Sequence, residues 1–175
     1  METAVIRTLL LLTALLLPTT ALAVPAGVPL WEDAATGMDQ EEVLARFPEA
    51  RALAPDEGDQ PKRPEQGKER VRIPEVEIAG ERYRAGFYFL EGALARVVLE
   101  MPRAEGMPFS RGLKLTEEVR DALTQTYGEP ASKDSSGKGY MVEWRDGPTV
   151  IRLVVLTQTY KVKKFEIIYE AAPQD

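Results

Sequence analysis

The chain of 175 residues contains no cysteine and no histidine. Without cysteine it can form no disulfide bond, use no thiol chemistry and carry no lipid of the kind that bacterial lipoproteins attach to cysteine. Without histidine it lacks the most common general base and the most common imidazole ligand of metals. Histidine-based catalytic triads and structural zinc sites are therefore excluded, and carboxylates remain for acid–base chemistry.

Positive charge is also scarce. The 22 Lys and Arg residues are outnumbered by 28 Asp and Glu residues, which gives a net charge of −6. A moderately acidic surface argues against nucleic acid and against anionic lipid as partners, because both repel negative charge. The basic run at 161–164, KVKK, is interpreted as a solvated turn and strand edge that discourages aggregation.

Only one long hydrophobic run occurs, at the N-terminus. Residues 1–23, METAVIRTLLLLTALLLPTTALA, combine Arg7, an apolar stretch, and small residues at Ala21 and Ala23. This order predicts a secretory signal peptide that is cleaved after Ala23. An uncleaved membrane anchor is the alternative, although the apolar stretch is shorter than the ~20 residues that span a bilayer. We therefore expect an exported protein, periplasmic or secreted, with no membrane span after cleavage.

Residues 24–175 have a length that suits a single domain with its own hydrophobic core. The segment 54–70, APDEGDQPKRPEQGKER, has no apolar periodicity and contains three prolines. It is predicted to be a flexible loop. Its acidic run at 56–59, DEGD, lacks the ligand spacing of a calcium-binding loop and is interpreted as solvated charge.

The first helix is predicted from residues 37–47, GMDQEEVLARF. Asp39 can accept a hydrogen bond from the first turn while Glu42 reaches back to the backbone of Asp39, an arrangement called a capping box. Met38 and Val43 occupy the positions of a hydrophobic staple, and a proline follows where the helix should stop. These roles explain the residue types without a ligand, so the segment indicates the fold and not a site.

Two sets of three antiparallel strands are predicted from alternating apolar residues between turn signals. The strands are 71–80, 81–92 and 93–101 in the first set, and 140–147, 148–156 and 163–170 in the second. Pro74 breaks the alternation of its strand and predicts an edge or a bulge. A second helix is predicted over 115–127, ended by Gly128 and Pro130, and 131–139 is predicted to be a loop.

A helix followed by three strands thus occurs twice, which predicts a tandem αβββ repeat over 37–101 and 111–170. The likeness of 39–43, DQEEV, to 115–119, LTEEV, supports a duplication, and chance similarity of two helix starts is the alternative. Both alternatives predict the same α+β fold. It has two layers, with two helices packed on one face of an antiparallel sheet.

The stretch GMDQEEVLARF, followed after a loop by a meander of strands, resembles the tandem helix-plus-sheet unit of the beta-lactamase inhibitor proteins and of the BamE/SmpA-type outer-membrane assembly proteins. Those families begin the helix with Gly-Met-Thr or Gly-Met-Ser, and Gly37, Met38 and Asp39 stand at these positions. The resemblance implies an exported two-layer protein that binds other proteins. The chain departs from both families, because it has neither the lipid-bearing cysteine of the assembly proteins nor the disulfide cysteines of the inhibitors.

No catalytic residue, cofactor site or metal site is predicted. Glu41, Glu42, Glu117 and Glu118 are all expected in first helical turns, where the positive end of the helix dipole favours acidic side chains without a catalytic role. A hydrolase or lyase that works through carboxylates alone is an alternative function. It would require a concave cluster of Asp or Glu with shifted pKa values.

Surface recognition is the predicted function, because aromatic and arginine side chains are the usual anchors of protein interfaces. The aromatic residues that could be partly exposed are Trp31, Tyr88, Tyr140, Trp144 and Tyr160. The residues predicted to bind a partner are Tyr88, Tyr140, Trp144, Arg84 and Arg145. Alternation places Tyr88 on the face opposite Phe87 and puts Tyr140 and Trp144 on one face of their strand. Ordinary core or strand-pairing roles are the alternative for these aromatics.

The sequence therefore predicts a non-enzymatic exported protein that binds a protein of the cell envelope. An exposed aromatic patch on the uncovered sheet face would favour this function. A small-ligand carrier is a further alternative and would need an apolar cavity between helices and sheet. The identity of the partner and the oligomeric state are left open.

Overall fold

The computed structural model describes residues 25–58, 63–136 and 138–173, so the predicted signal peptide, 1–23, lies outside the described residues. The helices are α1 (Gln40–Arg46), the short 3₁₀ helix η1 (Pro64–Gln66) and α2 (Phe109–Tyr127). The strands are β1 (Arg51–Ala52), β2 (Lys68–Ile78), β3 (Glu81–Leu90), β4 (Ala93–Glu100), β5 (Ser132–Ser136), β6 (Gly139–Asp146), β7 (Thr149–Gln158) and β8 (Lys161–Ala171). No helix within the described ranges is long and apolar enough to cross a membrane.

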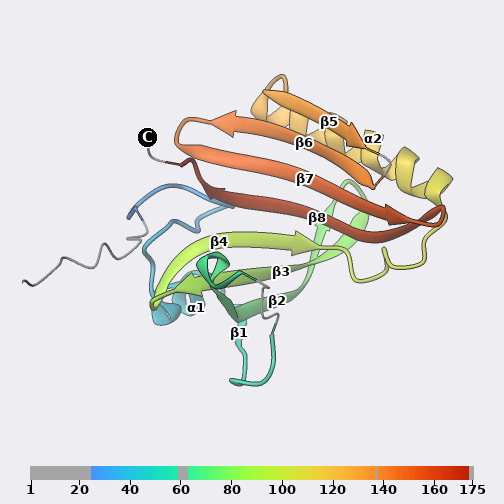
Figure 1. Ribbon diagram of the computed structural model, residues 1–175. Coiled ribbons are helices and arrows are strands. Elements are labelled where there is room, and N and C mark those ends of the chain that lie inside the picture. The colour runs from blue at the N-terminus through green and yellow to red at the C-terminus, as the bar shows by residue number, and fades with distance from the viewer. Residues whose placement is uncertain (1–24, 59–62, 137, 174–175) are drawn as a thin grey trace, which may run out of the picture.

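The strands form one antiparallel sheet in the order β1-β2-β3-β4-β8-β7-β6-β5 (Figure 1). Strands adjacent in sequence pair with each other except at the centre, where β4 pairs with β8. The half of the sheet that follows α1 and the half that follows α2 therefore meet through their last strands. Because that central pair is antiparallel, the two halves have a local two-fold arrangement.

Each half contains the three predicted strands and one more. β1 pairs with β2 through Arg51 and Ala52, and β5 pairs with β6 along its whole length. The prediction of a loop over 131–139 is therefore wrong. All five side chains of β5 are exposed, so this strand lacks the apolar alternation by which strands are recognised in a sequence.

The predicted loop over 54–70 also ends earlier than expected, because β2 begins at Lys68. The first buried side chain of β2 is Glu69, and a charged residue gives no hydrophobic signal. Residues 59–62 lie outside the described part of the chain. Pro74 lies at a shift of register between β2 and β3, which confirms the predicted bulge.

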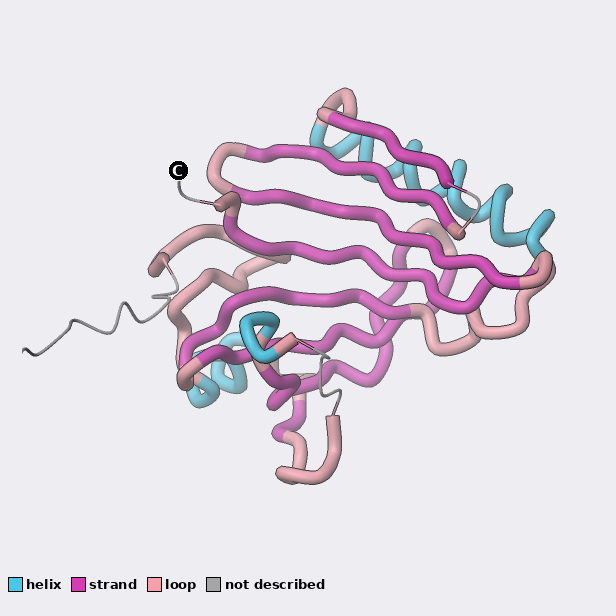
Figure 2. Tube along the Cα trace, in the orientation of Figure 1, coloured by secondary structure: helices cyan, strands magenta, loops and turns pink. Residues whose placement is uncertain are grey.

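The register of the strands separates two faces of the sheet. One row of paired residues crosses five neighbouring strands and consists of Phe87, Val97, Tyr169, Ile151 and Trp144. All of them are buried, and they share one core cluster with Val43 of α1 and Val119 of α2. Both helices therefore cover the same face, as predicted, and they lie behind the sheet in Figure 2. We call the other side the uncovered face.

The start of α1 is as predicted. The backbone N–H of Glu42 donates to Asp39 Oδ1 at 2.8 Å, and the N–H of Asp39 donates to Glu42 Oε2 at 2.9 Å. Gly37 precedes this capping box with φ of +87°, and a Cβ there would lie 3.0 Å from the Cβ of Ala26. Both the backbone conformation and the available space therefore favour glycine at this position.

The start of α2 differs from the prediction. It begins at Phe109, before the predicted start at Leu115, and its first turn contains no acidic residue. Glu117 and Glu118 lie inside the helix, so their predicted place in a first turn is wrong. The segments DQEEV and LTEEV thus occupy different places in their helices. The repeated order of elements, and not this likeness, is what relates the two halves.

Candidate partner-binding site

The structure divides the residues predicted to bind a partner between the two faces. Trp144 is 0% exposed, and Tyr140 is partly buried against the same core. The expectation that Trp144 lies on a contact surface is therefore wrong. Tyr140 and Trp144 do share a face, as the alternation predicted, but it is the face that the helices cover. Trp31 is also buried, stacked on Phe47 with ring centroids 6.0 Å apart.

Tyr88 lies on the uncovered face but is not an exposed anchor. It is only 5% exposed, and the guanidinium of Arg96 lies 4.4 Å from the centroid of its ring. A cation above an aromatic ring is attracted by the electrons of the ring. The ring of Tyr88 is thus covered by the side chain of Arg96. This agrees with the alternative given in the sequence analysis, an ordinary core or strand-pairing role.

Ion pairs extend across the uncovered face. They join Arg84 with Glu100, Arg145 with Glu143, Arg152 with Glu143 and Glu170, and Lys164 with Glu166. The pairs made by Arg84 and Arg152 join neighbouring strands, where opposite charges stabilise a sheet by about 0.2–1 kcal/mol per pair. The other two pairs lie within β6 and within β8. Arg84 and Arg145, predicted as interface anchors, therefore have carboxylate partners within the sheet. Among the described residues the exposed aromatic side chains are Phe109, at the start of α2, and Tyr160, in the turn between β7 and β8.

Carboxylates gather on the uncovered face without forming a pocket. Glu100 and Glu166 are opposite each other on β4 and β8. Burial raises the pKa of Glu166, and the nearby ammonium of Lys164 opposes this shift. Four pockets of the described chain each have at most one carboxylate in their lining. Within the same ranges no group of three Asp or Glu is placed to hold a metal ion. These pockets do not provide the paired acids that a carboxylate enzyme needs.

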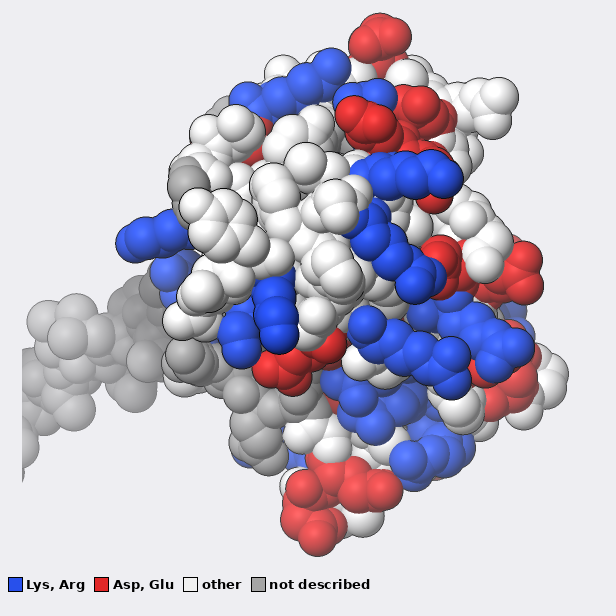
Figure 3. Space-filling model, turned by 90° about the vertical axis from the view of Figure 1, so that its right-hand side faces the viewer, with Lys and Arg blue, Asp and Glu red and all other residues white. Residues whose placement is uncertain are grey.

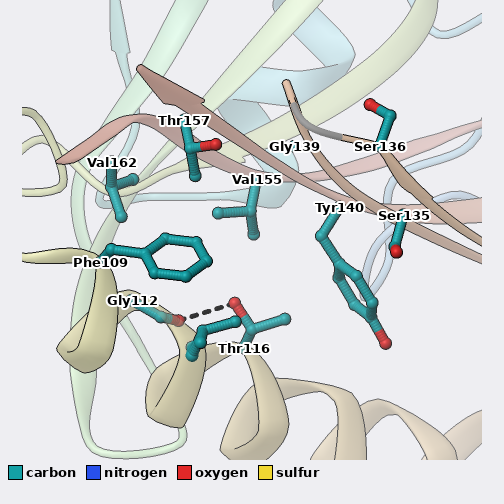
Figure 4. A pocket seen from close by; sticks show the side chains of 11 residues that line it. Phe109, Gly112, Thr116, Ser135, Ser136, Gly139, Tyr140, Val155, Thr157 and Val162 are labelled. Carbon is teal, nitrogen blue, oxygen red and sulfur yellow. Dashed lines mark hydrogen bonds between the residues drawn. The ribbon is translucent and has the colours of Figure 1, made fainter. Parts of the chain in front are cut away.

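A pocket of about 200 Å³ opens between α2 and the sheet (Figure 4). We call it the helix-side groove. Its lining consists of Phe109, Gly112, Leu113 and Thr116 from α2, and of Ser135, Ser136, Gly139, Tyr140, Val155, Thr157 and Val162 from the sheet. Phe109, Tyr140 and Val155 point into the space between the strands and the helix. The groove is therefore mostly apolar.

Gly112 fixes how closely α2 approaches the sheet at this groove. A Cβ at this position would lie 2.4 Å from Cγ2 of Val162, which is fully buried. The hydroxyl of Thr116 donates to the backbone carbonyl of Gly112 at 2.7 Å. Because its hydrogen is used inside the helix, Thr116 presents little unsatisfied polarity to the groove.

A second depression, also of about 200 Å³, lies on the other side of the hairpin formed by β5 and β6. We call it the sheet-side depression. Asp134, Lys138, Met141, Val154 and Leu156 line it, together with Ser136, Gly139 and Tyr140, which it shares with the helix-side groove. The two hollows thus share residues at the end of the hairpin.

The exposed large apolar side chains of the described chain all gather here. Phe109 and Leu113 line the helix-side groove, and Met141 and Leu156 line the sheet-side depression. Tyr160, in the β7–β8 turn, is 86% exposed, and its expected exposure is confirmed. Exposed apolar groups gathered in one area are typical of an interaction surface. We call these five residues the apolar end.

Lysine side chains border the apolar end. Figure 3 views the part of the molecule where α2 begins and β7 meets β8, and it shows an uncharged area bordered by Lys and Arg side chains, with Asp and Glu side chains among them. Lys133, Lys138 and Lys161 have no ion pair within the described ranges, and neither has Asp134, whose side chain lines the sheet-side depression. Lys114 pairs with Glu118 at 3.6 Å. Unpaired lysines therefore outnumber the unpaired carboxylate among these residues.

Most of the apolar end is not evident from the sequence. Phe109 and Leu113 precede the predicted start of the second helix, and Leu156 ends a predicted strand as one more apolar residue. The one sequence signal for this region is the pair Thr159-Tyr160. It lies in the turn between two predicted strands, contains no glycine and places an aromatic residue in the turn.

Comparison with known proteins gave no match: no family model, no curated protein and no solved structure matches this chain. The resemblance to beta-lactamase inhibitor proteins and to BamE/SmpA-type proteins therefore rests on the Gly37-Met38-Asp39 helix start and on the order of elements. It stays a prediction.

Proposed function

We propose that this chain is a non-enzymatic protein, periplasmic or secreted, that acts by binding another protein of the cell envelope through the apolar end. The observation that carries the proposal is the location of the exposed large apolar side chains of the described residues, all of which belong to this one region. Burying such side chains against a partner is favourable, because each removes apolar surface from water.

The size of the hollows favours a protein over a small molecule as the partner. Small-molecule sites have volumes of about 300–1,000 Å³, whereas the helix-side groove measures about 200 Å³. A hollow of this size suits one or two apolar side chains of a partner. Side chains inserted into such pockets commonly supply most of the binding energy of a protein interface.

A small-ligand carrier is the second candidate. Such a carrier needs an apolar cavity between a helix and the sheet, and the helix-side groove lies there. Its lining is mostly apolar, which suits an apolar ligand. The small volume limits that ligand to a fragment-sized molecule or to one end of a longer chain.

Site-specific photo-crosslinking in the producing cells tests the proposal. A photoreactive amino acid replaces Leu113 in one variant of the full-length chain and Glu41 in a matched control, because Glu41 is exposed on α1, away from the apolar end. We expect a discrete protein adduct from position 113 and none from position 41. Adducts with small molecules alone would assign the groove to a carrier, and equal adducts at both positions would refute a specific site.

A further inference from the structure

The outer edge of β5 is open in the described sheet. β5 is last in the strand order and pairs only with β6, without a shift of register over Ser132–Ser136. At the other edge, β1 comprises only two residues. An edge strand presents backbone N–H and C=O groups that can pair with another chain.

The side chains of β5 do little to block this edge. The strand contains no proline and no bulge, and its only charged residues are Lys133 and Asp134. Because all its side chains are exposed, β5 also adds nothing to the hydrophobic core. Its position, directly beside both hollows, is what distinguishes it: Ser136 lines the helix-side groove and the sheet-side depression alike.

The register of β5 determines where an added strand would place its side chains. Ser135 is opposite Tyr140, on the face covered by α2, and Asp134 is opposite Met141, on the uncovered face. Successive side chains of a strand point to opposite faces. A strand that pairs with β5 would therefore point successive side chains to the two faces on which the helix-side groove and the sheet-side depression lie.

We propose that the partner supplies an extended segment that pairs with the open edge of β5, with neighbouring apolar residues that fill the two hollows and acidic residues at its ends. The acidic ends follow from Lys133, Lys138 and Lys161, which have no carboxylate partner among the described residues and outnumber Asp134, the carboxylate of β5. This inference rests on the proposed function, and it adds the chemical class of the partner segment and the way it pairs.

Amide hydrogen exchange, followed by NMR on the chain without its predicted signal, tests the backbone pairing. The probe is a short blocked peptide with a central run of leucine and valine, threonine on each side and glutamate at both ends. The control peptide is N-methylated at two adjacent central residues, which removes backbone donors on both of its edges. We expect amides of Ser132–Ser136 to gain protection with the probe only, and those of β1 to be unchanged. Unchanged exchange in β5 at the highest soluble peptide concentration would overturn the proposal.

Two exposed leucines, one on each side of the hairpin, test whether both hollows are filled. Leu113→Ser alters the helix-side groove and Leu156→Ser alters the sheet-side depression, and neither residue is buried. Each substitution is expected to weaken binding of the probe about tenfold, while the exposed control Lys68→Ser leaves binding unchanged.

The pattern of effects separates the two proposals. Weakening by Leu113→Ser alone would overturn strand addition and leave binding at the groove intact. No effect of either substitution, together with no protein adduct at position 113 in cells, would overturn both proposals. If the chain alone sediments as a dimer that Leu156→Ser dissociates, the edge is occupied by a second copy, and the proposal of a separate partner segment fails.

Discussion

The backbone N–H of Phe109 donates a hydrogen bond of 3.0 Å to the backbone carbonyl of Tyr160. This bond connects the start of α2 to the turn between β7 and β8, and an isolated bridge between Pro108 and Lys161 supports it. Two exposed aromatic residues that are far apart in the sequence are thereby held side by side. Under the proposed function a partner would meet them as one surface, although each comes from a different local structure.

The β7–β8 turn should gain stability when Tyr160 is replaced by glycine. Thr159 and Tyr160 both have positive φ, 50° and 61°, as a type I′ turn requires. The other two-residue turns of this kind, at β2–β3 and β3–β4, have Gly80 and Gly92 at the second position. A left-handed conformation costs a non-glycine residue about 1–2 kcal/mol, and glycine loses more entropy on folding. We expect Tyr160→Gly to raise the free energy of unfolding in urea by about 0.5–1 kcal/mol.

The same substitution should weaken partner binding, because it removes the most exposed aromatic of the apolar end. Ala79→Asn is a matched control: it improves another type I′ turn, at the β2–β3 hairpin, by a similar mechanism. This control should gain stability and keep full binding in the crosslinking experiment. A loss of stability in Tyr160→Gly would contradict the proposed strain, and unchanged binding would exclude Tyr160 from the interface.

The capping box of α1 should contribute measurably to stability. Asp39 accepts from the N–H of Glu42, and its own N–H donates to the Glu42 carboxylate. Removing an N-cap side chain costs about 0.5–2 kcal/mol, so we expect Asp39→Ala to lower the free energy of unfolding by about 1 kcal/mol. Glu41→Ala, which alters the same turn outside the box, should change it by less than half as much. Equal losses in the two variants would show that general charge effects, and not the cap, stabilise the turn.

Tyr83→Phe should stabilise the protein. The hydroxyl of Tyr83 is buried and has no hydrogen-bond partner in the described chain, while its ring packs against Phe165 at 6.2 Å between centroids. Burial accordingly raises the pKa of Tyr83 well above its ordinary value. A buried polar group without a partner costs about 1–3 kcal/mol, so its removal should raise the free energy of unfolding by about 1 kcal/mol.

Tyr169→Phe is the matched control for that substitution, because Tyr169 has a polar neighbour, Tyr127, whose ring centroid lies 6.4 Å from its own and which contributes to its raised pKa. Removing a hydroxyl that has such a neighbour should lower the free energy of unfolding by about 1 kcal/mol. Chemical denaturation of both variants gives the comparison. A loss of stability in Tyr83→Phe would show that this hydroxyl forms a bond in solution.

The layers of the fold could be predicted because they depend on local patterns. The capping box around Asp39, the bulge at Pro74 and the turns at Gly80 and Gly92 each follow from the residues themselves, and all are confirmed. β5 could not be predicted, because its polar residues form a strand only through backbone pairing with β6. Its stability comes from tertiary context, which outweighs intrinsic strand preference.

The candidate site was harder to predict than the fold. Alternation correctly placed Tyr140 and Trp144 on one face, but it cannot say which face the helices cover. The apolar end combines the start of α2, the end of one hairpin and the turn of another. Their proximity depends on long-range contacts such as the bond between Phe109 and Tyr160. A single sequence contains no local signal for such contacts.

The stability of the protein should depend on pH through Glu166. Burial raises the pKa of this carboxyl above its ordinary value near 4.5, and Glu100 adds to the shift, while Lys164 and Arg96 oppose it. The folded protein therefore binds a proton at Glu166 more tightly than the unfolded chain does. Stability from this group is present below the unfolded pKa and is lost as pH rises through the folded pKa.

Replacing the carboxyl by an amide should remove this dependence. The free energy of unfolding of the wild type, measured relative to Glu166→Gln, should increase as pH falls from neutrality to below about 4.5. Lys164→Met should extend the effect to higher pH, because Lys164, at 2.6 Å from Glu166, favours the ionised form. Urea denaturation of the three proteins across this pH range is the measurement. Parallel curves for the wild type and Glu166→Gln would show that the carboxyl ionises as readily in the folded sheet as in the unfolded chain.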